Sequence, residues 1–109
     1  MVERHWKGIA KFEEVDSYTE YLMKETFPKM GTMDGFIKAS ILERHLANGV
    51  EVLVVTVWTS MDAIEQFAGI NPHKAVVPLK VQEMMITYDQ EALHYEFSCG
   101  WWSKKECSH

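Results

Sequence analysis

The apolar run VEVLVVTVW at residues 50–58 is the feature that most constrains the fold. A strand with one face in water alternates apolar and polar residues, whereas this run is apolar at nearly every position, as expected when both faces are covered. Residues 35–45 are also rich in β-forming residues, and Asn48-Gly49 between the runs predicts a two-residue hairpin because both residues tolerate positive φ. We therefore expect residues 35–45 and 50–58 to form adjacent antiparallel strands.

A helix is predicted before this hairpin, over residues 13–30. Ser17 and Glu20 match a capping box, although the helix can also begin earlier, at residue 13 or 14. Pro28 and Gly31 predict its end. The spacing of the apolar residues places on one helical face the set Val15, Tyr18, Tyr21, Leu22 and Thr26.

A second helix is predicted directly after the hairpin, in TVWTSMDAIEQFAG at residues 56–69. Thr59 or Ser60 can cap this helix, and Gly69 predicts its end. Its apolar face consists of Met61, Ile64, Phe67 and Ala68.

The remaining segments complete the pattern of elements. Residues 4–12 and 91–97 predict a first and a last strand. In residues 71–78, the sequence NPHKAVVP predicts a short helical turn with Asn71 as its cap and Pro78 as its terminator. Residues 79–89 are compatible with either extended or helical structure.

The element order β-α-β-β-α-β predicts an α+β fold, a ferredoxin-like antiparallel sheet with both helices on one face. The other face of the sheet needs a cover, and a second copy of the chain is the simplest one, so we expect a homodimer packed sheet to sheet. We expect one domain over residues 1–100 and a C-terminal tail over residues 101–109.

Charge and composition exclude several classes of protein. Eleven basic residues are scattered among 16 acidic ones, with a net charge of -5, which argues against a nucleic-acid partner. No apolar run approaches the roughly 20 residues of a membrane span, and the N-terminus lacks the apolar stretch of a signal peptide, so we expect no membrane partner and a cytoplasmic location.

The two cysteines, Cys99 and Cys107, lie near the C-terminus. In a reducing cytosol we expect two free thiols, with a disulfide as the alternative. A metal site built from Cys99, Cys107 and His109 would match no zinc spacing and would lack a fourth ligand, so we expect no metal.

Several segments together resemble the antibiotic biosynthesis monooxygenase (ABM) family of dimeric α+β barrel proteins. The matching pieces are WKG at 6–8, GF at 35–36, LVVTVWTSMDAIEQFAG at 53–69, HKAVVP at 73–78 and HYEF at 94–97. The resemblance implies the ferredoxin-like fold and the homodimer, and it is greatest to a subgroup whose members mostly have no assigned reaction.

Two characterised branches of that family allow a comparison of site residues. The heme-degrading members share the tryptophan at Trp58, but their iron-ligating histidine corresponds to Val77, so heme degradation is not implied unless His73 substitutes. The quinone-forming monooxygenases also share only Trp58; their asparagine and tyrosine correspond to Val54 and Ile64. Those enzymes use no flavin or metal, and the deprotonated substrate reduces oxygen directly. The resemblance therefore implies no cofactor.

Such chemistry needs a base, an apolar pocket and a group that stabilises an anion. His94, on the strand expected beside the first one, is the candidate general base, with a pKa near neutrality; the alternative is a histidine bonded within the sheet or at the dimer interface. His73 is the second catalytic candidate, with solvent exposure as the alternative. The candidate substrate-binding residues, each of which could instead belong to the core, are Trp6, Tyr21, Phe36, Trp58 and Phe67.

Two functions follow as expectations. The first is a cofactor-independent monooxygenase acting on a small aromatic or polyketide-like substrate. The second is a non-catalytic homodimer that binds a small hydrophobic molecule or serves in a stress response. An isomerase or lyase that works by proton transfer on the same fold is a third alternative.

Overall fold

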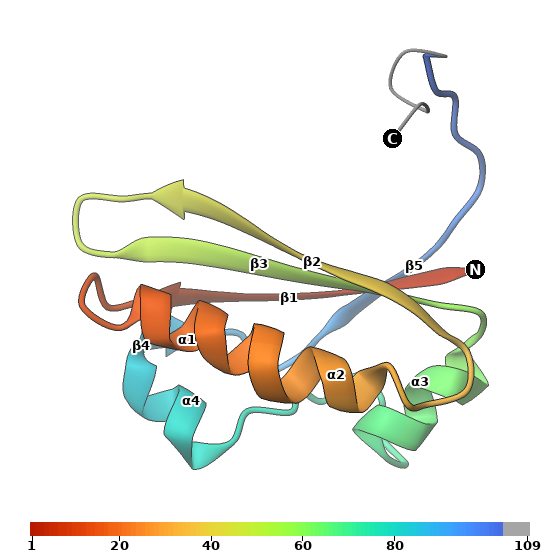
Figure 1. Ribbon diagram of the computed structural model, residues 1–109, viewed down its shortest axis with the longest axis horizontal. Helices are drawn as coiled ribbons and strands as arrows, with labels where there is room; N and C mark the ends of the chain where they lie inside the picture. The colour runs from red at the N-terminus through yellow and green to blue at the C-terminus, as the bar shows by residue number, and fades with distance from the viewer. Residues whose placement is uncertain (104–109) are drawn as a thin grey trace.

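The computed structural model describes residues 1–103 of the chain, which form one antiparallel sheet with all helices on one side of it (Figure 1). The sheet order is β2-β3-β1-β4, and β5 also pairs with β1, so the predicted α+β, ferredoxin-like fold is confirmed. The elements are β1 (Val2–Ala10), α1 (Val15–Tyr21), the π-helical turn η1 (Leu22–Thr26), α2 (Phe27–Met30), β2 (Phe36–His45), β3 (Val50–Trp58), α3 (Met61–Ala68), α4 (Leu79–Met84), β4 (Met85–Tyr88) and β5 (Leu93–Glu96).

The last strand, predicted over residues 91–97, is confirmed as β5, and a further short strand, β4, precedes it along β1. β4 pairs with β1 at Gly8–Ala10, and β5 pairs with it at Val2–His5. Residues 79–89, which the sequence left open, are helical first and extended afterwards. Pro78, predicted to terminate the preceding turn, is instead the N-cap of α4, and its carbonyl accepts hydrogen bonds from the N–H groups of Val81 and Gln82.

The hairpin between β2 and β3 is confirmed, but the predicted two-residue turn is wrong. His45 pairs with Val50, so residues 46–49 form a four-residue loop, which the Leu46 N–H closes by donating to the Gly49 carbonyl (2.8 Å). Neither Asn48 nor Gly49 has a positive φ. Gly49 is required for another reason, because a Cβ there would lie 2.6 Å from the Ala10 carbonyl oxygen.

The first helix begins after Glu14, so the earlier start is confirmed and the Ser17-Glu20 capping box is wrong. Pro28 does not end the helix either. A proline has no N–H to donate to the preceding turn, and the chain passes through a π-helical turn just before it, in which the Phe27 N–H donates to the Leu22 carbonyl. The helix then continues to Met30.

The capped second helix is confirmed as α3. The Ser60 hydroxyl accepts a hydrogen bond from the Ala63 N–H (3.2 Å), and the helix ends before Gly69. The short helical turn predicted in residues 71–78 is confirmed only at its start: one turn forms, with the Lys74 N–H donating to the Asn71 carbonyl (3.1 Å), and the chain has no helix between it and Pro78.

The core lies between the helices and the alternate residues of the sheet that face them. One cluster surrounds Tyr18, Leu22 and Val52, and a second surrounds Trp58 and Ile64. The opposite face of the sheet is bare in the single chain, and its exposed or half-buried apolar side chains include Leu42, Leu53, Val55, Leu93 and Tyr95.

After β5 the chain leaves on the side of the sheet away from the helices (Figure 1). Residues 97–103 have no regular secondary structure, and Trp101 and Trp102 are exposed. Cys99 is an exposed free thiol; the predictions made for Cys107 and His109 concern positions outside the described residues. No helix in the described part of the chain is long and apolar enough to cross a membrane.

Candidate functional site

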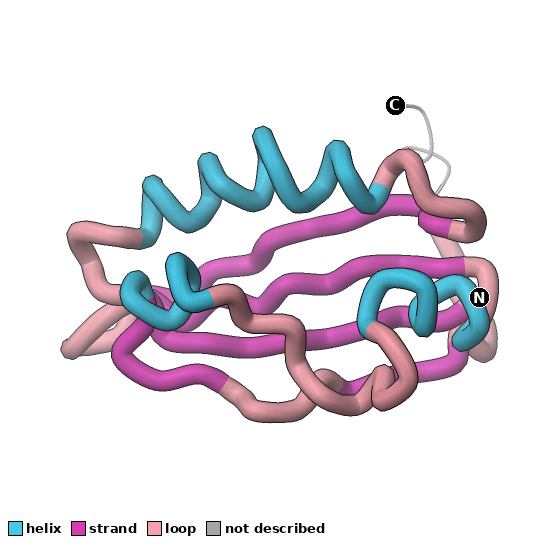
Figure 2. Tube along the Cα trace, turned by 90° about the horizontal axis from the view of Figure 1, so that it is seen from below, coloured by secondary structure: helices cyan, strands magenta, loops and turns pink. Residues whose placement is uncertain are grey.

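A cavity lies within the helical layer, above β1 and β3. Figure 2 shows the arrangement: the long helix α1–α2 runs along one side, and α3, α4 and the segment between them lie along the other. The inner part of the cavity has a volume of about 70 Å³ and the outer part about 310 Å³. Both parts are lined by the same central set of side chains, Trp6, Tyr18, Leu22, Thr26, Phe67 and Val76.

Trp6 forms one wall of the cavity because the alternation along β1 turns it toward the helices. Its Nε1–H donates to the Asp89 carbonyl (2.9 Å), and its ring lies 6.4 Å from that of Tyr18. Gly8 leaves room for this ring, since a Cβ at position 8 would lie 2.9 Å from the Trp6 Cη2 atom. The indole is therefore held at the cavity by the backbone just after β4 and by the space that Gly8 leaves on β1.

Arg4, which sequence analysis did not select, lines the inner part of the cavity and is only 5% exposed. Its Nη1 donates to the Pro72 carbonyl and to His94 Nε2 (2.9 Å), and its Nη2 donates to the Lys74 carbonyl (3.2 Å). Burial lowers the pKa of Arg4 to about 10, and among the described residues no carboxylate forms an ion pair with it. The result is a buried guanidinium without a counter-ion.

The sequence contained a pattern that could have identified Arg4 as a candidate site residue. Because side chains on a strand alternate between faces, Val2, Arg4, Trp6 and Ala10 must share one face, and that face is otherwise apolar. An arginine on such a face is unusual, since this side chain is seldom fully buried without a partner.

His94 lies opposite Arg4 in the β1–β5 ladder, and its environment differs from that expected of a general base. A guanidinium only donates, so His94 Nε2 must accept from it, and the proton sits on Nδ1, which is buried and has no partner among the described residues. Burial first, and then Arg4 and His73, lower the pKa of His94 to about 4. This is well below neutrality, and the ring does not line the cavity.

His73 lies beside His94, with ring centroids 5.3 Å apart, but it is exposed and does not line the cavity. The structure therefore brings the two candidate histidines together around Arg4, outside the cavity itself. These environments match the alternatives given for the two residues, namely a histidine hydrogen-bonded within the sheet for His94 and a solvent-exposed histidine for His73.

The five aromatic candidates separate into two groups. Trp6 and Phe67 line both parts of the cavity, and Tyr21 lines the outer part. Trp58 is 0% exposed and belongs to the core, where its Nε1–H donates to Thr56 Oγ1 (2.9 Å) and its ring packs against Phe36 and Phe67. Trp58 and Phe36 are thus not among the residues that line the cavity.

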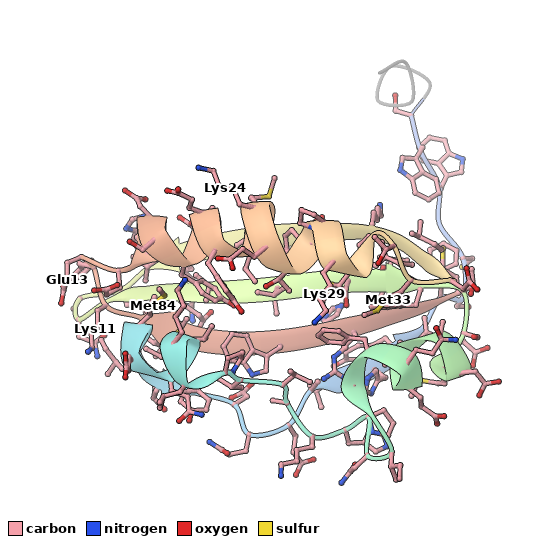
Figure 3. The ribbon with its side chains drawn as sticks, turned by 60° about the horizontal axis from the view of Figure 1, so that its bottom comes forward. Lys11, Glu13, Lys24, Lys29, Met33 and Met84 are labelled. Carbon is pink, nitrogen blue, oxygen red and sulfur yellow. The ribbon has the colours of Figure 1, made fainter. Side chains whose placement is uncertain are left out.

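The mouth of the cavity carries charged groups. Glu25 and Lys29 line its outer part, and Lys29 extends from the cavity side of the helix while Lys24 points away from it (Figure 3). Glu25 lies 3.6 Å from Lys80 in an exposed ion pair. Within residues 1–103, no three histidine, cysteine, aspartate or glutamate side chains are placed to hold a metal ion together.

No protein-family model and no curated protein matches the sequence. Among the solved structures with a similar backbone are two proteins that are both named putative antibiotic biosynthesis monooxygenase. The one from Bacillus cereus has 19% identity and a TM-score of 0.64 over 94% of this chain and 98% of its own. The one from Deinococcus radiodurans has 16% identity and a TM-score of 0.63 over 93% and 96%. At these identities the likeness shows that the chain has the fold of such proteins.

Proposed function

We propose that this chain is a cofactor-independent monooxygenase that binds a small aromatic or polyketide-like substrate in the cavity above β1 and β3. The observation that carries the proposal is the aromatic lining of that cavity by Trp6, Tyr18 and Phe67. The outer part, at about 310 Å³, is roughly twice the ~150 Å³ cavity that holds benzene in another protein. A molecule of two or three fused rings fits such a space, and the fold of the two structural neighbours is compatible with the reaction.

The reaction would convert an activated methylene group into a carbonyl. Loss of a proton from carbon gives a carbanion that transfers electrons to oxygen, and the balance is one methylene and one O₂ to one carbonyl and one water. With His94 Nε2 bonded to Arg4 and the pKa of that ring at about 4, a neutral-pH base is not supplied by His94. The substrate must therefore be acidic enough to ionise readily, as a methylene is when the rings delocalise its carbanion onto a carbonyl oxygen.

Oxygen uptake with anthrone as the probe tests the proposal. Anthrone added to purified protein, with no flavin or metal, should give oxygen consumption above the spontaneous rate and anthraquinone as the product. Trp6→Ala and Phe67→Ala should each reduce this rate at least tenfold. Phe12→Ala is the matched control, since Phe12 is exposed and does not line the cavity. A rate that equals the protein-free rate, or an equal loss in all three variants, would refute the proposal.

One observation favours a second candidate, a non-catalytic dimer that binds a hydrophobic molecule. The described side chains that line the cavity include no histidine, and the nearby His94 is a weak base. This candidate predicts tight binding of aromatic molecules without oxygen uptake. Calorimetric titration with anthrone under nitrogen, beside the oxygen measurement in air, separates the two functions.

We further propose that a second copy of the chain covers the bare face of the sheet. In the single chain, β3 is the central strand next to β1 and β2, and Leu53 and Val55 on it are only half-buried by their neighbours. Light scattering should give the mass of a dimer, and Leu53→Asp should give a monomer because a carboxylate cannot be buried without a partner. Met23→Asp, on the exposed outer surface of the long helix, should remain a dimer. A monomeric wild-type protein would exclude this assembly.

A further inference from the structure

The contacts that hold the buried Arg4 side chain in place do not neutralise its charge. A buried cation is costly unless an anion or a full set of hydrogen bonds compensates for it. Among residues 1–103, no carboxylate pairs with Arg4; its hydrogen-bond partners are two backbone carbonyls and the His94 ring, and its Cζ lies over the Phe67 ring, 5.8 Å from the centroid. The side chain therefore retains its whole positive charge at the inner part of the cavity.

The hydrogen bonds of Arg4 leave two of its donors free. A guanidinium has five N–H groups. Both on Nη1 and one on Nη2 are used by Pro72, His94 and Lys74, which leaves the Nε–H and the second Nη2–H. Those two groups lie on adjacent nitrogens of one planar group, the arrangement that binds a carboxylate through two parallel hydrogen bonds.

The free Nε–H is not sealed within the protein. In the described part of the chain, the buried polar side-chain atoms without a partner are Thr19 Oγ1 and His94 Nδ1. Arg4 Nε is not among them and has no hydrogen-bond partner within residues 1–103, so the protein does not fully cover this atom, and the Arg4 side chain lines the inner part of the cavity. The remainder of the lining is largely aromatic and aliphatic, which offers little to a second polar group at that depth.

We infer that the ligand of this cavity is an aromatic oxyanion, whose charged oxygens bind the free edge of Arg4 while its rings lie against the cavity lining at Trp6 and Tyr18. The inference rests on the proposed function, since it concerns the same cavity. The oxyanion is a carboxylate or an ionised phenol, and the two are distinguished by their probes.

Calorimetric titration of wild-type protein at pH 7.5 with matched pairs of probes tests the inference. One pair is 2-naphthoate and 2-naphthamide, and the other is 2,4-dinitrophenolate and 2,4-dinitroanisole. Hydrogen bonds to a charged group correspond to about a 10- to 100-fold change in affinity, so the anion of at least one pair should bind at least tenfold more tightly than its neutral partner. The preferred pair identifies the kind of oxyanion.

Variants then assign the preference to Arg4. Arg4→Met should abolish the preference for the anion, and Arg4→Lys should weaken it, because an ammonium has the charge but not the planar edge. Lys24→Met, which removes an exposed cation outside the cavity, should leave the preference unchanged. Circular dichroism checks that each variant is folded. If Arg4→Met does not fold, the test of anion binding by Arg4 uses Arg4→Lys together with the comparison of probes on the wild-type protein.

The outcomes separate this inference from the proposed function. Equal binding of charged and neutral probes would refute the oxyanion and leave the aromatic cavity intact. No binding of any probe to folded protein would refute the cavity as a binding site. An anion preference that survives in Arg4→Met and Arg4→Lys would place the anion elsewhere and overturn the inference.

Discussion

Replacing Trp58 by phenylalanine should destabilise the protein by about 2–3 kcal/mol and leave binding in the cavity unchanged. The indole is 0% exposed, so the substitution removes buried atoms, worth about 1 kcal/mol at ~25 cal/mol per Å². It also removes the hydrogen bond to Thr56 Oγ1, worth about 1 kcal/mol. The gap left beside Phe36 and Phe67 adds a further cost, because the surrounding core relaxes only partly.

Urea denaturation followed by circular dichroism measures this difference, with wild type and variant at equal protein concentration because an oligomer's stability depends on it. Titration with 2-naphthoate at low urea measures the affinity. Trp6→Phe is the matched control: it alters the cavity wall and should weaken 2-naphthoate binding severalfold. If Trp58→Phe weakens binding as much as Trp6→Phe does, Trp58 contacts the ligand and the assignment of this residue to the core is refuted.

Three further changes test other parts of the structure by the same denaturation assay. Gly49→Ala should cost about 2 kcal/mol or more of stability, because its Cβ would lie 2.6 Å from a backbone carbonyl of β1. Asn48→Ala should cost under about 0.5 kcal/mol, as neither residue has a positive φ. Equal costs would support the two-residue turn at Asn48-Gly49 and contradict the four-residue loop. Ser60→Ala should cost about 1 kcal/mol through the lost cap, and Thr59→Ala clearly less; the reverse order would contradict the cap. Burial and Arg4 lower the pKa of His94 to about 4, so as the pH falls from about 6.5 to about 4 the unfolded chain binds the proton before the folded chain does. His94 therefore lowers the stability of the fold across that window, by on the order of 1 kcal/mol after allowance for its partial exposure. A His94→Gln variant whose stability falls as steeply as that of wild type in this window would show that His94 does not contribute.

The elements of the fold were largely predictable because they depend on local patterns. The apolar run of β3 and the capped, periodic residues of α3 need only short-range information, and both predictions are confirmed. The predictions were wrong where contacts with a segment distant in the sequence determine the local structure. The loop at Gly49 is shaped by the nearby end of β1, and residues 71–78 follow the backbone of another segment, with Lys74 opposite Glu91.

The candidate site was less predictable, because its residues come together only through the sheet. Trp6 and Phe67 were identified by their aromatic character, and both line the cavity. His94 was selected for the ordinary pKa of its residue type, yet Arg4, 90 positions away in the sequence, accounts for part of the shift of that pKa and occupies its Nε2.

The sequence by itself determined most of the strands and helices and, through their order, the ferredoxin-like arrangement, because hydrophobic periodicity and capping act over a few residues. Only the tertiary structure decided that Trp58 fills the core, that Trp6 and Phe67 line a cavity, and that Arg4 keeps an unpaired charge there. Burial, hydrogen bonding and ionisation depend on what surrounds a side chain in three dimensions, and those neighbours come from β1, β5 and the segment after α3, which are far apart along the chain.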